Sequence, residues 1–491
     1  MSDFEQDLDG DLRRGVAGQQ GALVDAGWLD PSLLELPEWG YRDSAHRVAG
    51  IVLGYRNDRG IGSQDNRHVL TVAGSRGGKG VSLIVPNLLL YDGSVLAIDP
   101  KGELAKITAR ARREKGQKVV VLDPFGESGL ASGRFNPLAQ LDPAGTNVKD
   151  DAALIADALI VANERDPHWT DSARILVKAA ILYALTLPEA DRHLITVWQL
   201  LSGQHAIVTD VARRAECSKR VALFKLLQGC TGVFDDTVAA AGENFGQMAD
   251  RELASVFSTT LTQLEFLDSK AMEDVLIESD LALAELKTGR ATLYLCLPAT
   301  RMGTHSRWLR VIINLALVAF ERTKVKVDIP VLMVLDEFAV LGHMKSVEVA
   351  AGLMAGFGVK LWIVLQDLTQ IKRLYKESWE TFIGNAGIAT FWSNSDKTTL
   401  DYLSEKLGQT SVRLAQSNDI TFQQRMSGAT GMREELRVQR LAAAHELEQM
   451  LERKKKRILV MAAGHPPVIL ERILYYDPDD PNFVGKYDNP E

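Results

Sequence analysis

Short runs of β-branched and aliphatic residues constrain the fold of this chain most. Each run ends where glycine, proline or an acidic residue takes over. Strands buried on both faces of a parallel sheet are continuously apolar, and helical stretches between the runs predict βα units on one parallel sheet. We place the strands at 68–73, 95–98, 119–122, 292–297, 331–335, 361–365, 388–391 and 458–461.

The length and the composition indicate a globular protein. With 491 residues the chain is long enough for several domains of roughly 150 residues. The formal net charge is −8, so any contact with a polyanion has to use a local basic surface. Three cysteines, Cys217, Cys230 and Cys296, are too few for a disulfide framework and lack metal-ligand spacing, so we expect a reducing compartment.

A glycine-rich segment follows the first predicted strand. Glycines let successive backbone N–H groups curl around an anion, and a lysine at the next helix N-terminus can reach the outer phosphates of a nucleotide. The strict pattern fails twice, because Ala73 replaces the first glycine and Gly80 replaces the hydroxyl that helps to hold Mg²⁺. A glycine-rich turn without ligand is the alternative interpretation. The predicted phosphate-binding residues are Gly74, Ser75, Arg76, Gly77, Gly78, Lys79, Gly80 and Val81.

Pro86 lies in the helix that is expected to follow Lys79. A proline inside a helix removes a hydrogen-bond donor and costs about 3 kcal/mol. We therefore expect this helix to be kinked or short.

Two further strand ends carry polar side chains. Asp336 at the end of 331–335 can hold Mg²⁺ through water, and Glu337 can activate the attacking water. Gln366, after 361–365, can orient that water or sense the γ-phosphate. Solvated strand ends are the alternative, but ligands bind at this edge of a parallel sheet. We therefore predict Lys79, Asp336, Glu337 and Gln366 as catalytic residues.

A long helical stretch interrupts the strand pattern. Between 147 and 287 apolar residues recur at helical spacing, for example at Ile175, Ala179 and Leu182. The stretch is too long for a loop, so we expect an inserted all-helical domain. The expected organisation is an uncertain segment at 1–66, the first part of a nucleotide-binding domain at 67–146, the insert at 147–287, the second part at 288–478 and a tail at 479–491.

Several short motifs occur in order along most of the chain. They are Gly78-Lys79-Gly80, Val85-Pro86-Asn87-Leu88-Leu89, Asp99-Pro100-Lys101-Gly102-Glu103, Phe135-Asn136-Pro137-Leu138, Leu335-Asp336-Glu337-Phe338, Gln366-Asp367-Leu368 and Gly464-His465-Pro466-Pro467. Together they resemble the type IV secretion coupling proteins, the TraG/TraD-like conjugative DNA-transfer ATPases. In that family Gly-Lys-Gly is a common form of the phosphate loop.

The resemblance implies a fold, cofactors and partners. The implied fold is α/β, a RecA-like P-loop NTPase with a parallel sheet and an inserted all-α domain. The implied cofactors are ATP and Mg²⁺, with Asp336 holding the metal through water. The implied partners are single-stranded or duplex DNA, a relaxase or secreted proteins, type IV secretion components, and further copies of the chain in a homo-hexamer.

Two departures from the family pattern stand out. The first residues lack a signal peptide, and no apolar stretch reaches the roughly 20 residues that span a bilayer. We therefore expect a soluble, cytoplasmic chain that reaches the inner membrane through partners. The family-like motor also expects an arginine from a neighbouring subunit, yet none stands between Glu337 and Gln366. Lys360 and Arg373 are the nearest cations.

Two other functions remain as alternatives to a DNA-translocating ATPase. One is a soluble receptor that recruits secreted proteins with nucleotide as an ordering ligand. The other is a cytosolic DNA pump of the FtsK/HerA type that works without a channel. Glu337 favours an enzyme, because a scaffold has no need of an acid that activates water. The basic run at 453–457 can contact phosphates or simply end a helix in solvent.

Overall fold

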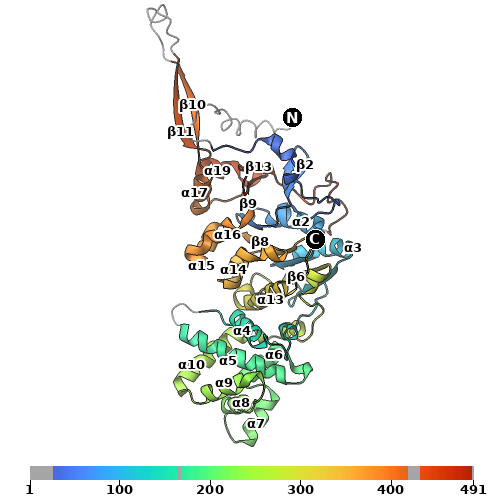
Figure 1. Cartoon of the computed structure of the whole chain (residues 1–491), viewed down its shortest axis with the longest axis vertical. Coiled ribbons are helices and arrows are strands. Elements are labelled where there is room, and N and C mark those ends of the chain that lie inside the picture. Colours follow the sequence, from blue (N-terminus) through green and yellow to red (C-terminus); the bar gives the residue numbers. More distant parts are fainter. Residues whose placement is uncertain (1–25, 163–166, 418–431, 489–491) are drawn as a thin grey trace, which may run out of the picture. The chain divides into compact units, whose positions relative to one another are not determined.

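The computed structural model describes residues 26–162, 167–417 and 432–488 (Figure 1). The chain forms two compact units, each assembled from stretches that are distant in sequence. Unit 1 comprises Met1–Asn87 and Ile363–Asp477, and unit 2 comprises Leu88–Trp362 and Pro478–Glu491. Strand β8 (Val359–Leu365) and helix α2 (Val85–Leu90) each include a point where the chain passes from one unit to the other.

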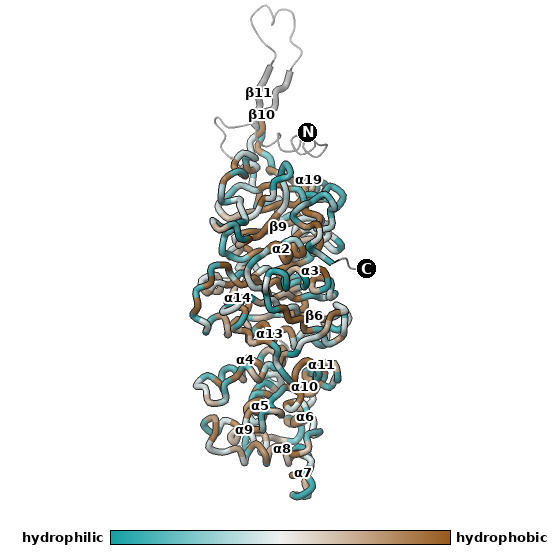
Figure 2. Tube along the Cα trace, turned by 90° about the vertical axis from the view of Figure 1, so that its right-hand side faces the viewer, coloured by the Kyte–Doolittle hydropathy of each residue, from teal (hydrophilic) through white to brown (hydrophobic). Residues whose placement is uncertain are grey.

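The sheet of unit 2 is wholly parallel, as predicted. Its strand order is β7 (Val331–Leu335), β4 (Val95–Asp99), β6 (Ala291–Cys296) and β5 (Lys118–Leu122). Every residue of β4, β6 and β7 is buried, which explains why these strands are apolar apart from Thr292 and the terminal Asp99; Figure 2 shows the hydrophobic colour at β6. The carboxyl ends of these strands therefore meet along one edge.

The sheet of unit 1 is mixed. Its strand order is β2 (Arg59–Ser63), β1 (Ile51–Arg56), β13 (Val468–Glu471), β12 (Arg457–Ala462), β9 (Ala386–Trp392) and β3 (His68–Ala73). Strands β3 and β9 pair in parallel, but β12 runs antiparallel to β9, with Leu459 opposite Phe391. The prediction of a parallel strand at 458–461 is therefore wrong in direction, because an apolar run reports burial on both faces and not polarity.

The described residues between 147 and 287 form helices and no strand. In α5, Leu176 and Leu182 are buried, whereas Ile175 is 56% exposed, so the expected apolar face is wrong at Ile175. Ile175 follows Asp171 by one helical turn and lies on the polar stripe of this helix. The helices are α4 (Val148–Leu159), α5 (Pro167–Thr186), α6 (Leu194–Ser202), α7 (Ala206–Arg214), α8 (Lys219–Gln228), α9 (Thr237–Gly246), α10 (Asp250–Leu264), α11 (Lys270–Leu276) and α12 (Glu285–Thr288).

The other helices accompany the strands within each unit. In unit 2 they are α3 (Glu103–Glu114), α13 (Met302–Arg322) and α14 (Lys345–Leu353), and in unit 1 they are α15 (Leu368–Tyr375), α16 (Glu380–Gly384), α17 (Lys397–Lys406) and α19 (Ala444–Met450). No helix in the described stretches combines the length and the apolar character needed to cross a bilayer.

A two-stranded ribbon belongs to unit 1. Strands β10 (Gln409–Ser417) and β11 (Met432–Arg440) pair antiparallel along their whole length and project away from α17 and α19 (Figure 1).

Arg112 of α3 holds the end of α2 from within unit 2. Its guanidinium is fully buried and donates hydrogen bonds to the carbonyls of Leu88, Tyr91 and Gly93. The last carbonyls of a helix have no partner inside the helix, so the arginine satisfies groups that burial would otherwise leave unbonded. Burial lowers the pKa of Arg112 to about 10, which leaves it charged at neutral pH.

Candidate functional site

Three glycines of the predicted phosphate loop are required by their surroundings. A Cβ atom on Gly74 would lie 1.9 Å from the carbonyl oxygen of Ser393, and one on Gly77 would lie 2.7 Å from the carbonyl oxygen of Gly74. Gly78 has φ +81°, a conformation that side-chain-bearing residues rarely adopt. A Cβ on Gly80 would meet no atom within 4 Å. The loop therefore depends on glycine at 74, 77 and 78 and not at 80.

Lys79 stands at the start of the helix that follows the loop. The first turn is a π-helix (η3, Gly80–Ile84), in which the Val85 N–H donates to the Gly80 carbonyl, and α2 continues from it. Pro86 lies directly after this wider turn, and α2 has only six residues. The helix is thus irregular and short, as the presence of Pro86 predicts. Turns of π-helix are also frequent at functional sites.

The end of β9 lines the loop in unit 1. Trp392 Nε1–H donates to the Gly77 carbonyl at 2.8 Å, and the Trp392 carbonyl accepts from Gly74 N–H at 3.2 Å. Asn394 Nδ2 donates to the Gln366 carbonyl at 3.2 Å, which brings the predicted glutamine to the segment that packs on the loop. Buried Ser393 Oγ and Asn394 Oδ1 have no hydrogen-bond partner in the described part of the chain.

The acidic pair lies at the edge of the unit 2 sheet. Asp336 and Glu337 are half-buried and follow β7 directly. Asp336 Oδ1 accepts the Glu337 N–H at 2.9 Å, and Glu337 has φ +50° and ψ +41°, a left-handed conformation that is rare for a residue with a side chain. This backbone turn fixes the direction in which each carboxylate leaves the strand.

Arg310 of α13 secures the segment that follows the acidic pair. This segment begins with the short helix η8 (Phe338–Leu341). The buried guanidinium of Arg310 donates to the Leu341 carbonyl at 2.6 Å and to the His343 carbonyl at 2.9 Å. The long helix therefore holds the turn that positions Asp336 and Glu337.

A third acid lies at the same edge of unit 2. Asp99 ends β4 and is 1% exposed, and its Oδ2 accepts the Ala105 N–H at 2.8 Å. Burial raises the pKa of Asp99 to about 6, and the Asp336 carboxylate contributes to the rise. Cys296 Sγ also donates to Asp99 Oδ2, and burial raises the pKa of this thiol. Asp99 thus orders the turn between β4 and α3.

The predicted residues divide between the two units. The phosphate loop and Gln366 belong to unit 1, and Asp336 and Glu337 belong to unit 2. Lys360 is 1% exposed in β8, so its cation is not offered to a neighbouring subunit, whereas Arg373 is exposed on α15.

Metal binding would depend on few protein ligands. No cluster of three or more His, Cys, Asp or Glu side chains suited to a metal occurs in the described residues. Mg²⁺ in phosphate-transfer sites uses one or two carboxylates together with phosphate oxygens and water. The single carboxylate of Asp336 therefore fits such a metal only together with a phosphate ligand.

Sequence reasoning missed four contributors to the loop. Trp392, Ser393 and Asn394 follow a predicted strand as polar strand-end groups, so the criterion that selected Gln366 would have found them. Arg472, which donates to the Gly77 carbonyl, carries no such signal, because 395 residues separate it from its partner.

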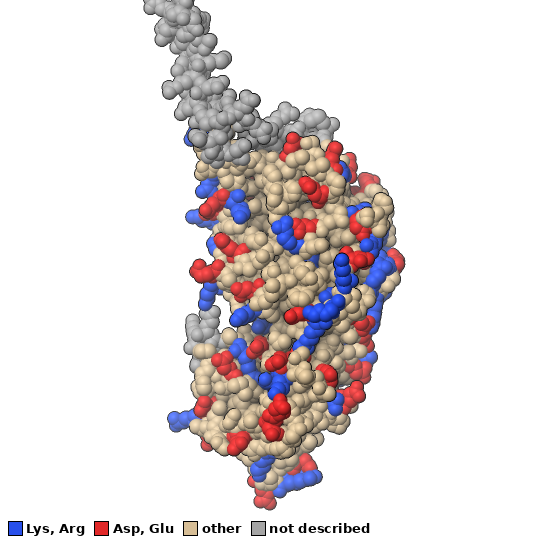
Figure 3. Space-filling model, viewed as in Figure 1, with Lys and Arg blue, Asp and Glu red and all other residues tan. Residues whose placement is uncertain are grey.

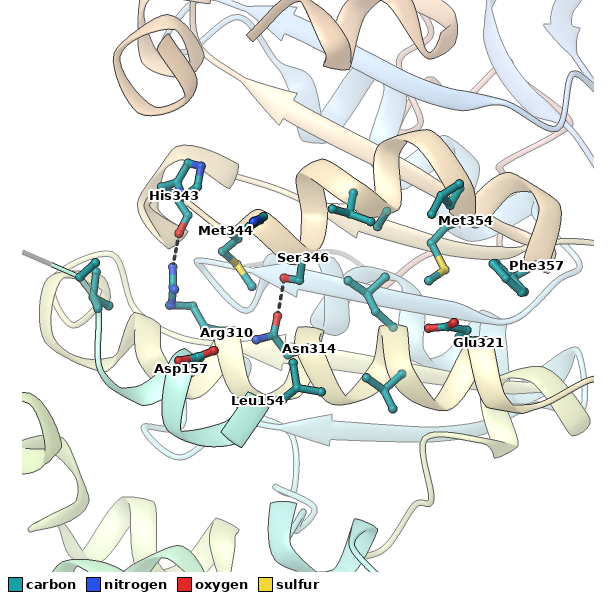
Figure 4. A pocket seen from close by; sticks show the side chains of 18 of the residues that line it. Leu154, Asp157, Arg310, Asn314, Glu321, His343, Met344, Ser346, Met354 and Phe357 are labelled. Atoms are coloured by element: carbon teal, nitrogen blue, oxygen red, sulfur yellow. Dashed lines mark hydrogen bonds between the residues drawn. The ribbon is translucent and has the colours of Figure 1, made fainter. Parts of the chain in front are cut away.

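A cavity of about 760 Å³ lies beside α13 and α14 in unit 2 (Figure 4). Figure 4 shows polar groups that are joined across it: Arg310 reaches the His343 carbonyl, and the Ser346 hydroxyl donates to Asn314 Oδ1 at 2.6 Å. The described residues that line it are mostly apolar and include no glycine, so this cavity has no phosphate loop.

Comparison with solved structures identifies the fold. TrwB, a plasmid coupling protein, was solved in complex with the ATP analogue ADPNP and aligns with a TM-score of 0.63 at 14% identity over 96% of this chain and 99% of that chain. The unbound monoclinic form of TrwB aligns with a TM-score of 0.62 at 14% identity, over 90% of this chain and 92% of that chain. These likenesses confirm the predicted α/β fold of the RecA-like P-loop NTPase type.

Sequence comparison identifies the family. TraG of Rhizobium radiobacter, a conjugal transfer protein, is 26% identical over 427 residues, which cover 85% of this chain and 63% of TraG. VirD4 of Agrobacterium fabrum is 25% identical over 461 residues, which cover 90% of this chain and 64% of VirD4. The chain thus spans slightly less than two thirds of these curated relatives. Residues 35–487 match the type IV secretory system conjugative DNA transfer family, and the chain belongs to that family.

Proposed function

We propose that this chain is an ATP-hydrolysing motor that binds DNA or nucleoprotein and moves it to a type IV secretion channel. The observation that carries the proposal is the phosphate loop, whose Gly74, Gly77 and Gly78 are demanded by contacts and backbone conformation. Family membership supports the coupling role, and TrwB, solved with ADP and Mg²⁺ and with ADPNP, supports ATP and Mg²⁺ as cofactors.

Nucleotide binding would begin at the loop. Backbone N–H groups at the start of η3 have no partner inside the helix and can donate hydrogen bonds to phosphate oxygens, and Lys79 adds a positive charge at the same end. When bound, Mg²⁺ neutralises charge on the β- and γ-phosphates. Gly80 supplies no hydroxyl, so Asp336 would be the residue that holds the metal, through water.

Hydrolysis would use Glu337 and Gln366. The Glu337 carboxylate accepts a proton from the attacking water, and the Gln366 amide orients that water for in-line attack. The left-handed backbone conformation of Glu337 fixes the direction in which its side chain leaves the chain. This reduces the reorganisation that the carboxylate needs for proton transfer.

Family membership supports the partners that we propose. We include DNA, single-stranded or duplex, a relaxase or other secreted protein, secretion-channel components and a homo-hexameric ring. Acidic and basic side chains are interspersed on the face seen in Figure 3, which matches the net charge of −8. DNA contact would therefore use local basic groups, such as the exposed Arg453 and Lys454.

Titration calorimetry with ATP and Mg²⁺ tests the nucleotide site. Wild-type protein should bind, and Lys79→Ala should not, because the variant lacks the loop lysine that reaches the outer phosphates. Equal affinity in the two proteins would refute the assignment. Lys101→Ala is the control, because this exposed lysine follows β4 of unit 2 and is not part of the loop.

Turnover measurements test the motor. ATP hydrolysis should be measured without DNA, with single strands and with duplex, together with the particle size. Stimulation by DNA is expected of a motor. Binding without turnover would instead favour the receptor that uses nucleotide as an ordering ligand. DNA-stimulated turnover in the absence of any contact with secretion components would favour the cytosolic pump.

A further inference from the structure

Arg472 lies behind the phosphate loop in unit 1. It follows strand β13, and its backbone N–H donates to the Lys456 carbonyl at 2.7 Å. Its side chain is 7% exposed. One terminal nitrogen, Nη1, donates to the Gly77 carbonyl, and the other, Nη2, donates to the Arg453 carbonyl at 2.7 Å. The guanidinium therefore connects the loop to the basic run at 453–457.

The charge of Arg472 has no counter-charge in the described part of the protein. Both hydrogen-bond acceptors are neutral carbonyls, Nε has no partner, and no carboxylate there forms an ion pair with the guanidinium. Burial and the nearby Arg453 lower the pKa of Arg472, while Tyr476 raises it. A buried cation without a partner costs several kcal/mol, so a counter-ion from outside the chain would stabilise it.

The hydrogen bonds to Gly77 also fix the next peptide group. The Gly77 carbonyl accepts from Trp392 Nε1–H and from Arg472 Nη1–H. In a trans peptide the carbonyl of one residue and the N–H of the next point in opposite directions. Anchoring the Gly77 carbonyl therefore turns the Gly78 N–H away from Trp392 and Arg472. An anion-binding loop needs its N–H groups held in one direction in this way.

We propose that Arg472 is a positioning residue of the nucleotide site. It orients the Gly77–Gly78 peptide, and the phosphates bound in the loop are the counter-charge that its guanidinium lacks within the chain. The proposal rests on the proposed function, since it requires the loop to bind nucleotide phosphates. The proposal thus assigns a role in phosphate binding to a residue that is distant in sequence from the loop.

Four variants and one control separate the two roles of Arg472, which are to orient the Gly77–Gly78 peptide and to supply a charge that the phosphates balance. Arg472→Gln removes the charge, Arg472→Lys keeps the charge with a single donor group, and Trp392→Phe removes only the ring N–H. The fourth variant combines Trp392→Phe with Arg472→Gln. Arg59→Gln is the matched control, because it removes an exposed positive charge from β2 in the same unit, and its guanidinium donates to the Glu35 carbonyl and not to the loop.

Affinities for ATP and for inorganic pyrophosphate would be measured by calorimetry on variants whose thermal unfolding remains cooperative. Charge-assisted hydrogen bonds lead us to expect a loss of about tenfold or more for Arg472→Gln with both ligands, and recovery of most of it by Arg472→Lys. Trp392→Phe should lose less than about threefold, since one donor remains. The double variant should lose more than the product of the single losses. Arg59→Gln should stay within about twofold.

The outcomes distinguish this proposal from the function on which it rests. Wild-type protein that binds neither ATP nor pyrophosphate would overturn both. Wild-type binding with unchanged affinity in Arg472→Gln would overturn the role of Arg472 alone. If Arg472→Gln does not fold, Arg472→Lys combined with Trp392→Phe decides: an affinity of this combined variant for pyrophosphate equal to that of wild type would exclude the orienting hydrogen bonds.

Discussion

Asp151 and Arg322 form a two-pronged ion pair that joins the first insert helix, α4, to α13. The Oδ1–Nη2 distance is 2.6 Å and the Oδ2–Nη1 distance is 2.7 Å. The Asp151 side chain is 8% exposed, whereas that of Arg322 is 46% exposed. Helix α4 is thus tied by a specific contact to a helix that belongs to the β6–β7 connection.

Removing this pair should destabilise unit 2. We expect Asp151→Ala to lower the free energy of unfolding by about 1–2 kcal/mol, which is more than an exposed pair contributes and less than a fully buried one, because Arg322 remains partly hydrated. Urea unfolding followed by circular dichroism measures the change. Asp210→Ala, which breaks exposed pairs with Arg213 and Arg214 on α7, should cost less than about 0.5 kcal/mol. Equal costs would contradict the expectation.

Glu337→Gln should separate binding from hydrolysis. The amide keeps the size of the side chain but cannot accept the proton of water, so turnover should fall about 10²-fold or more while ATP affinity stays within about twofold. Single-turnover hydrolysis and calorimetry measure the two quantities. Glu114→Gln, an exposed exchange on α3, should change neither. Wild-type turnover in Glu337→Gln would remove Glu337 from the mechanism.

Gly80→Ser should be tolerated, because a Cβ at this position meets no atom within 4 Å. Serine also has a better helix propensity than glycine, by up to about 0.5 kcal/mol. We expect unchanged or slightly higher thermal stability and tighter Mg²⁺ binding in the presence of ATP, since the hydroxyl adds an oxygen ligand. In contrast, Gly77→Ser should abolish ATP binding, because its Cβ would clash with the Gly74 carbonyl at 2.7 Å. Similar defects in both variants would disprove this distinction.

Asp99 should make stability depend on pH. Burial raises its pKa from 3.8 to about 6, so the folded state holds the proton more tightly than the unfolded state does. Its stabilising contribution is complete below about pH 4 and is lost as the pH rises through about 6. Asp99→Asn keeps an acceptor for the Ala105 N–H and should flatten the profile over this interval. Urea unfolding at a series of pH values tests this, and an unchanged slope would rule Asp99 out as the source.

Activity should require neighbouring subunits. Lys79 and one metal neutralise the developing charge only in part, and a cation supplied in trans is worth about 10³–10⁵ in rate where one is used. Specific activity should therefore rise with protein concentration, and DNA should enhance it in a manner that weakens with added salt. Turnover and light scattering over a dilution series provide the measurement. Full activity in a monomer without DNA would contradict the ring.

All eight predicted strands are present, because strands such as β4 and β7 are buried on both faces and their sequences are correspondingly apolar. The hairpin of β1 and β2 was not predicted, although Asn57 and Asp58 carry its signal. Both have positive φ, +50° and +58°, which suits a two-residue hairpin turn. The direction of β12 is not encoded in its apolar run at all.

The site was partly predictable for a similar reason. Gly77 and Lys79 lie within one short segment, so local spacing reveals them. The sequence shows that Gly80 departs from the strict pattern. It does not show that a side chain at this position would meet no other atom, because the open space depends on the fold. Arg472 is brought to Gly77 by the pairing of strands that are distant in sequence, and a single sequence does not contain that information.

The left-handed backbone at Glu337 has a consequence for protein engineering. Glycine adopts this conformation without strain, so Glu337→Gly would relieve roughly 1 kcal/mol or more at that position. The same exchange would remove the carboxylate on which the proposed chemistry depends. A screen for thermal stability alone would therefore select Glu337→Gly, although this exchange would abolish the proposed ATP hydrolysis. Directed evolution of a more stable variant would have to select for ATP turnover at the same time.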